Sequence, residues 1–156
     1  MKVTDEVAVP LVEKADLAAM MRDYIAEMAT LIANVDPDRP YPYFDLYWSE
    51  PETRRPFWLR VADSNAGFAL LDLKAGEGRT EIAEFYVARG FRRRGIGRGA
   101  ARRLIARFPG GWRITQREEN APAIAFWHGV LDGFVTYREV TTRTDAVRRE
   151  QHFSVS

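Results

Sequence analysis

Apolar and polar residues alternate at the start of the chain, and short runs rich in apolar, β-branched and aromatic residues recur after it; both patterns are typical of β-strands. The predicted strands span residues 3–9, 57–62, 67–73, 82–87, 134–141 and 147–155. The second and third of these form a hairpin around a turn at residues 63–67. A second turn at residues 75–78 leads into the strand 82–87, and residues 143–145 join the last two strands.

Two stretches show helical spacing instead. In residues 13–35 apolar side chains recur every three or four positions, and Pro37 and Pro40 end the pattern. Residues 100–108 have one apolar face and one arginine-rich face. The predicted fold is therefore α+β (α/β mixed), with a mostly antiparallel sheet flanked by helices.

Composition narrows the class of protein. The chain has 156 residues, of which 46% are hydrophobic, so we expect a single domain spanning residues 1–156. Its net charge of only +1 gives no field that would attract nucleic acid or a membrane. With no cysteine and two histidines, no disulfide, thiol nucleophile or metal site is expected. The chain starts without a signal-like segment and has no long apolar run, so a cytoplasmic protein is expected.

The strand 82–87 leads into an arginine- and glycine-rich turn, Arg92-Arg93-Arg94-Gly95-Ile96-Gly97-Arg98-Gly99, and then into a helix. Backbone N–H groups converge in such a turn, the helix dipole adds positive potential, and glycine lets a phosphate approach the main chain. The sequence therefore predicts a site for a phosphorylated ligand.

Two nucleotide-binding motifs are alternatives for this turn. Residues 95–100 satisfy the G-x-G-x-x-A pattern of a dinucleotide-binding turn. However, seven residues separate the strand from Gly95, most of the chain precedes the motif, and too few elements follow for a doubly wound sheet. A Walker P-loop fails because no Gly-Lys-Ser/Thr follows.

The pattern Arg92-x-x-Gly95-x-Gly97 resembles the pyrophosphate loop of the GNAT superfamily of acyl-CoA N-acyltransferases. Downstream, Trp112-Arg113-Ile114-Thr115 is similar to the next strand of that family, and Asn120-x-x-Ala123-x-x-Phe126-Trp127 to its following helix. Gly133-Phe134 matches the pair that precedes the last strands. This resemblance covers about residues 80–137. It implies a GNAT fold and transfer of an acetyl group from acetyl-CoA to a primary amine of a small molecule or peptide, with no metal.

The resemblance also implies a set of coenzyme-binding residues. The turn would hold the pyrophosphate, and the backbone of Tyr86 and Val87 would bind the pantetheine arm, with the Val87 N–H as oxyanion donor. Asn120 would also meet the pantetheine or the adjacent strand, in addition to the N-cap that its position before Pro122 predicts. Trp127 would form a wall of the groove, with core packing against the sheet as the alternative. The coenzyme-binding residues of the turn are Arg92, Arg93, Arg94, Gly95, Ile96, Gly97, Arg98 and Gly99.

Catalysis requires a base for the amine and a proton for the leaving thiolate. Glu84 lies in an apolar strand, where desolvation would raise its pKa toward neutrality, and Glu81 precedes it by three residues. Either acid fits the family's base, and an internal ion pair is the alternative for Glu84. Many family members carry a tyrosine acid where this chain has Trp127, so Tyr86, Tyr137 or His128 is the candidate substitute, with solvent as the other source of the proton.

The aromatic stretch 41–48 is the expected acceptor pocket, with Asp45 or Glu50 available to pair with an amine. Packing of the first helix onto the sheet, or a contact between two copies in a homodimer, explains the same rings equally well. The expected substrate-binding residues are Tyr41, Tyr43, Tyr47 and Trp48.

Two other functions are compatible with parts of the sequence. A GNAT-like module that binds acyl-CoA without turnover is compatible with Trp127. A nucleic-acid binder would use the arginines between residues 89 and 107, but the small net charge offers no wider footprint for it.

Overall fold

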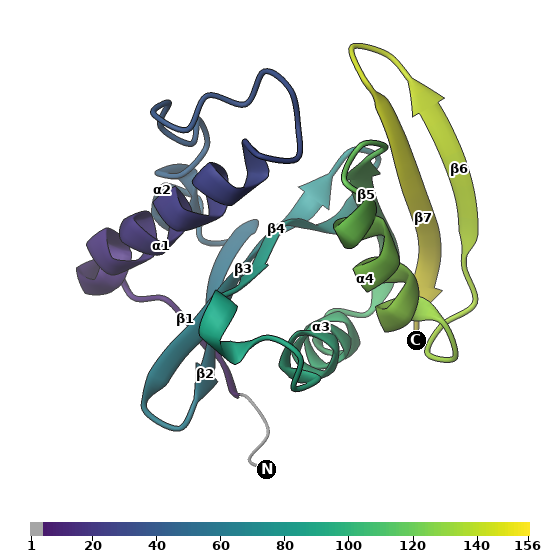
Figure 1. Cartoon of the computed structure of the whole chain (residues 1–156). Coiled ribbons are helices and arrows are strands. Elements are labelled where there is room, and N and C mark those ends of the chain that lie inside the picture. Colours follow the sequence, from purple (N-terminus) through teal and green to yellow (C-terminus); the bar gives the residue numbers. More distant parts are fainter. Residues whose placement is uncertain (1–4) are drawn as a thin grey trace.

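The computed structural model of the chain describes residues 5–156 and contains one seven-stranded sheet in the order β1-β2-β3-β4-β5-β7-β6 (Figure 1). Within the described residues, all neighbouring strands run antiparallel except the parallel pair β4 and β5. The α+β prediction with a mostly antiparallel sheet is confirmed. The strands are β1 (Asp5–Ala8), β2 (Arg54–Val61), β3 (Ser64–Ala75), β4 (Arg79–Val87), β5 (Gly110–Arg117), β6 (Arg138–Arg143) and β7 (Val147–Val155).

Helices cover both faces of the sheet (Figure 1). On one face, α1 and α2 bury the side chains of Trp58, Phe68 and Leu70. On the other, α3 and α4 pack on a larger core that includes Leu71 and Trp112. The helices are α1 (Lys14–Met28), α2 (Leu46–Ser49), α3 (Ile96–Arg107) and α4 (Ala121–Leu131), with short 3₁₀ turns η1 (Leu11–Glu13) and η2 (Arg89–Phe91).

The first helix is shorter than its sequence pattern predicts. It ends at Met28, not at residue 35, and residues 29–34 form turns. The Thr30 hydroxyl donates to the Glu27 carbonyl (2.7 Å), and Asn34 has a left-handed φ of 66°. Because Ile32 is buried inside these turns, it continues the apolar pattern without continuing the helix.

The hairpin turn is also misplaced in the sequence prediction. Residues 64–67 belong to β3, and the chain reverses at residues 62 and 63, where Ala62 has a φ of 53°. Gly67 serves a different purpose, since a Cβ there would lie 2.0 Å from the Tyr86 carbonyl oxygen on β4. At the C-terminal end, β6 begins at Arg138 and not at residue 134. The predicted first strand 3–9 is observed as β1, and its first two residues lie outside the described part.

Two irregularities of β4 shape the site. Its described pairing with β5 consists of Thr80 opposite Trp112, and beyond that point the two strands diverge. Toward β3, Glu84 faces Leu70 and Ile82 faces Leu71, so β4 holds an extra residue between two consecutive β3 positions. Because such a bulge reverses side-chain direction, Ile82 joins the core under α3 while Glu84 turns toward α1.

Candidate active site

A groove of about 550 Å³ lies where β4 leaves β5. Its walls come from the end of α1, the end of β4, the turn before α3 and the first part of α4. The lining residues are Tyr24, Glu27, Met28, Leu31, Phe85, Tyr86, Val87, Phe91, Arg92, Arg93, Gly95, Ile96, Gly97, Arg98, Asn120, Pro122, Ala123, Phe126 and Trp127. Of the twelve predicted coenzyme-binding residues, Arg94 and Gly99 are not on this wall.

The turn before α3 has the backbone of an anion site. Arg93 and Gly95 both have left-handed φ angles, 64° and 72°, and α3 begins directly afterwards at Ile96. Because N–H groups in the first helical turn have no partner within the helix, they remain free to bind an anion. A Cβ at Gly97 would lie 3.0 Å from the Phe126 ring and 3.1 Å from a Val87 methyl carbon, so glycine keeps this approach open.

The backbone at the end of β4 presents hydrogen-bonding groups to the groove. The Ala88 N–H donates to Ala66 on the β3 side (2.8 Å), and the Tyr86 carbonyl lies against Gly67 on the same side. Because successive residues of a strand point their polar groups to opposite edges, the N–H groups of Phe85 and Val87 face the open edge. An extended ligand can therefore pair with Phe85 and Val87 more readily than with the backbone of Tyr86.

Arg92 contacts protein groups on three sides. It donates to both carboxylate oxygens of Glu27 on α1, at 2.7 and 2.8 Å, and its Nε donates to the Val87 carbonyl at 2.8 Å. The hydrogen bond with Arg92 lowers the pKa of Glu27. Arg93 and Arg98 line the groove, whereas Arg94 lies over the ring of Phe91.

Glu84 lies on the α1 side of β4, close to the groove. Its carboxylate accepts hydrogen bonds from Tyr24 (2.7 Å) and Tyr41 (3.4 Å). Desolvation by the surrounding protein is the largest effect on this carboxyl and raises its pKa to about 7, although the two hydrogen bonds oppose the shift. A carboxyl of this pKa can accept a proton at neutral pH.

Glu81 is in a different environment. Its carboxylate is paired with Arg113 of β5 at 3.1 Å, near the point where the two strands separate. The Arg113 guanidinium engages this carboxylate on the β5 side of the strand, away from Tyr24 and Tyr41. The geometry therefore favours Glu84 over Glu81 as a proton acceptor.

Asn120 and Trp127 lie on the α4 side of the groove. The Asn120 side chain accepts a hydrogen bond from the Ala123 N–H (3.2 Å), as an N-cap does, and its amide approaches the sulfur of Met28 on α1 (3.6 Å). Trp127 is 6% exposed and packs edge-on against Phe85 and Phe126. The indole thus belongs both to the core and to the groove wall.

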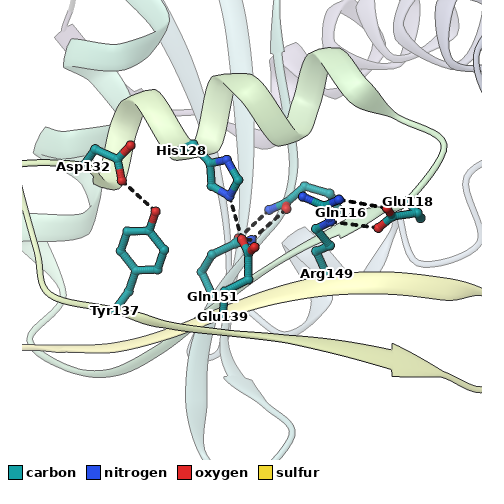
Figure 2. A network of polar contacts seen from close by, with 8 residues as sticks. All are labelled: Gln116, Glu118, His128, Asp132, Tyr137, Glu139, Arg149 and Gln151. Atoms are coloured by element: carbon teal, nitrogen blue, oxygen red, sulfur yellow. Dashed lines mark hydrogen bonds and ion pairs between the residues drawn. The ribbon is translucent and has the colours of Figure 1, made fainter.

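Of the three candidate substitutes for the general acid, Tyr86 lines the groove, whereas Tyr137 and His128 lie outside it. Tyr137 donates to Asp132 (2.6 Å), and His128 pairs with Glu139 of β6 (2.6 Å). Figure 2 shows both side chains between α4 and the β6–β7 hairpin. Tyr137 and Asp132 form a separate pair there, whereas the contact of His128 with Glu139 continues to the buried amides of Gln151 and Gln116. Neither Tyr137 nor His128 lines the groove.

The four predicted acceptor residues lie in different environments. The Tyr41 hydroxyl reaches Glu84, and Tyr47 is 1% exposed, with no hydrogen-bond partner for its hydroxyl among residues 5–156. Trp48 donates its indole N–H to the Val9 carbonyl (3.0 Å) and packs with α1, while Tyr43 is 55% exposed. The structure therefore brings only Tyr41 of this set into hydrogen-bond contact with Glu84.

The sequence prediction omitted nine residues that line the groove: Tyr24, Glu27, Met28, Leu31, Phe85, Phe91, Pro122, Ala123 and Phe126. Tyr24 and Glu27 lie three positions apart on α1, so both point to one face of that helix. The available signal was a hydroxyl and a carboxylate at the C-terminal end of an otherwise apolar helical pattern.

The sequence matches the model of the acetyltransferase (GNAT) family over residues 17–130, and the chain belongs to this family. A search of curated proteins found no match. Solved structures share the fold at low identity. An acetyltransferase from Thermus thermophilus is 18% identical, with a TM-score of 0.75 and coverage of 99% of this chain and 98% of that chain.

Two further structures extend the comparison. The ribosomal-protein-S18-alanine N-acetyltransferase of Escherichia coli is 15% identical, with a TM-score of 0.66 and coverage of 99% and 95%. A Salmonella typhimurium protein solved with its cofactor acetyl-CoA is 13% identical, with a TM-score of 0.71 and the same coverage. At these identities the likeness concerns the fold. Within residues 5–156 there is no cluster of potential metal ligands and no helix long and apolar enough to cross a membrane.

Proposed function

We propose that the protein is an acetyl-CoA-dependent N-acetyltransferase that acts on a primary amine of a small molecule or peptide. One observation carries the proposal. A carboxyl group whose pKa is raised to about 7, that of Glu84, accepts a hydrogen bond from Tyr24, and Tyr24 lines a groove that ends in an anion-binding turn. The groove supplies a place for the coenzyme, and the carboxyl supplies a base.

The groove fits acetyl-CoA in its chemistry. The turn at residues 93–98 provides N–H groups and two arginines for the pyrophosphate. The open edge of β4 provides N–H groups for the pantetheine amides, and glycine at position 97 leaves the wall free of a Cβ. Bound there, the coenzyme would supply an activated acetyl group.

The residues of the chain would then divide the chemistry. Glu84 accepts the proton that the attacking amine loses, and Tyr24 and Tyr41 hold its carboxylate in place. The Val87 N–H donates to the oxygen on which negative charge develops. A thiol has an ordinary pKa of about 8.5, so the thiolate leaves with little acid assistance and then takes up the proton that Glu84 received from the amine, or a proton from the neutral solution.

Calorimetric titration of acetyl-CoA, followed by thiol-release assays across a panel of primary amines, tests this function. Stoichiometric binding and release of thiol with at least one amine are expected, with no comparable affinity for NADH or NADPH. If either dinucleotide binds tightly and acetyl-CoA does not, the assignment of the turn is refuted.

A second candidate function is an acyl-CoA-binding module without turnover. Trp127 favours it, because an indole N–H cannot release a proton at neutral pH. Tight binding of acetyl-CoA with no thiol release from any amine would support this alternative.

A further inference from the structure

Every nitrogen of the Arg92 guanidinium already has an acceptor within the protein. Its two terminal nitrogens bind Glu27 Oε1 and Oε2, at 2.7 and 2.8 Å, and its Nε binds the Val87 carbonyl at 2.8 Å. The guanidinium carbon also lies 5.5 Å from the centre of the Tyr86 ring. A bidentate pair of this kind fixes orientation as well as charge.

The Glu27–Arg92 bridge joins three parts of the groove wall. Glu27 belongs to α1, Val87 is the last residue of β4, and Arg92 opens the glycine-rich turn. Both side chains are about two-thirds buried, with 28% and 34% of their surfaces exposed. Because Arg92 also lowers the pKa of Glu27, the bridge is ionic at neutral pH.

We propose that Glu27 is a positioning residue for coenzyme binding, and that it acts through Arg92. In this arrangement the first arginine of the turn braces the wall between α1 and β4 and is not a phosphate ligand. It holds the Val87 carbonyl, and so the end of the strand whose N–H faces the groove. The inference rests on the proposed function, since it assumes that the coenzyme occupies this groove.

A double-mutant cycle in the full chain tests the brace. The dissociation constant of acetyl-CoA is measured by calorimetry for the wild type, Glu27→Gln, Arg92→Gln and the double variant. Each single substitution should weaken binding about 10-fold, and the double variant should be no weaker than Arg92→Gln alone, because both remove the same contact. Glu77→Gln is the control. It removes the ion pair between Glu77, in the turn before β4, and Arg79, the first residue of β4, and should bind acetyl-CoA like the wild type.

Arg92→Lys separates the brace from a phosphate contact. A lysine keeps the positive charge but has one amine, which cannot reproduce the fork to Glu27 together with the bond to Val87. We expect it to bind no better than Arg92→Gln. Wild-type affinity in Glu27→Gln, or full affinity in Arg92→Lys, would overturn the proposal and indicate direct contact of Arg92 with phosphate.

Hydrogen exchange of the free protein provides a readout that needs no coenzyme. Glu27→Gln should speed amide exchange at the end of α1 and in residues 88–95, and Glu77→Gln should not. Unchanged exchange refutes the brace even if wild-type protein fails to bind acetyl-CoA. That failure of binding would refute the proposed function instead.

Discussion

The carboxylate of Glu84 experiences opposing influences from its surroundings. Desolvation raises its pKa, and the Glu81 charge adds to the shift, whereas the hydroxyls of Tyr24 and Tyr41 stabilise the charged form and lower it. The balance leaves the pKa at about 7. The residue is therefore half ionised near neutral pH, as an efficient general base requires.

For the kinetic role of this carboxyl, Glu84→Gln should lower kcat/KM by about 10²–10⁴-fold and leave acetyl-CoA affinity unchanged. In the wild type kcat/KM should rise with pH through an ionisation near 7, because only the carboxylate accepts a proton. That ionisation should be absent from the pH profile of Glu84→Gln. Both proteins are assayed with the same amine, so that ionisation of the amine affects both profiles equally. A crippled Glu81→Gln beside an active Glu84→Gln would move the base to position 81.

The raised pKa of Glu84 also predicts a pH-dependent stability. An unfolded glutamate has a pKa of about 4.3, so between that value and about 7 the folded protein holds a proton that the unfolded chain releases. The free energy of unfolding should therefore fall as pH rises through this window. Glu84→Gln should melt at a higher temperature than the wild type at pH 8, with a smaller difference at pH 4. A lower melting temperature at pH 8 would contradict the desolvation of Glu84.

Substitutions of Trp127 test whether its indole takes part in catalysis. Trp127→Phe keeps an aromatic ring beside Phe85 and Phe126 and should cost less than about 5-fold in kcat. Trp127→Tyr should preserve or raise kcat, since a phenol can supply the missing acid. Steady-state kinetics with saturating acetyl-CoA measure both. A large loss in Trp127→Phe at unchanged coenzyme affinity would instead assign a direct role to the indole N–H.

At the scale of elements, β4 and α3 together define the groove. Strand β4 bends away from β5 after Thr80, and its bulge turns Glu84 toward α1. Helix α3 begins at a turn with two left-handed residues. Arg98 of α3 lines the groove, whereas the later arginines of this helix bind protein groups. Arg102 donates to the carbonyls of Val130, Gly129 and Asp132 at the end of α4, and Arg103 pairs with Glu6 of β1.

Substitution at the start of α3 should close the groove. Gly97→Asp places a Cβ against Phe126 and Val87 and a negative charge where an anion binds, so calorimetry should show at least about 100-fold weaker acetyl-CoA binding. Gly90→Asp is the matched control, because it makes the same charge change in η2, where a Cβ would meet no atom within 4 Å. Normal binding by Gly97→Asp would remove this turn from the coenzyme site.

At the scale of the whole molecule, the sheet is divided into two parts that meet at β4 and β5. A continuous core beneath them compensates for the short pairing, with Trp112 fully buried and stacked on Phe153 of β7. The groove occupies the opening between the two parts. Residues from α1 to α4 therefore meet at one site although nearly 100 positions separate Tyr24 from Asn120.

The sequence was sufficient where local pattern decides structure. Three local features predicted their elements and the family: the glycine spacing at 95 and 97, the apolar and aromatic run before it, and the cap at Asn120. The sequence did not predict features that depend on contacts between distant parts of the chain. The buried Ile32 extended a helical pattern past the true end of α1, and no local signal reveals that Arg92 binds Glu27, 65 positions away.

The most direct test follows the acetyl group itself. Acetyl-CoA carrying an isotopic label in the acetyl group is incubated with the protein and a panel of primary amines, and the products are analysed by mass spectrometry. The label should appear in an amide of at least one amine, in parallel with thiol release, with little transfer by Glu84→Gln and none by Gly97→Asp. Label that stays on the coenzyme with every amine, while acetyl-CoA binds tightly, would contradict the assignment as an acetyltransferase.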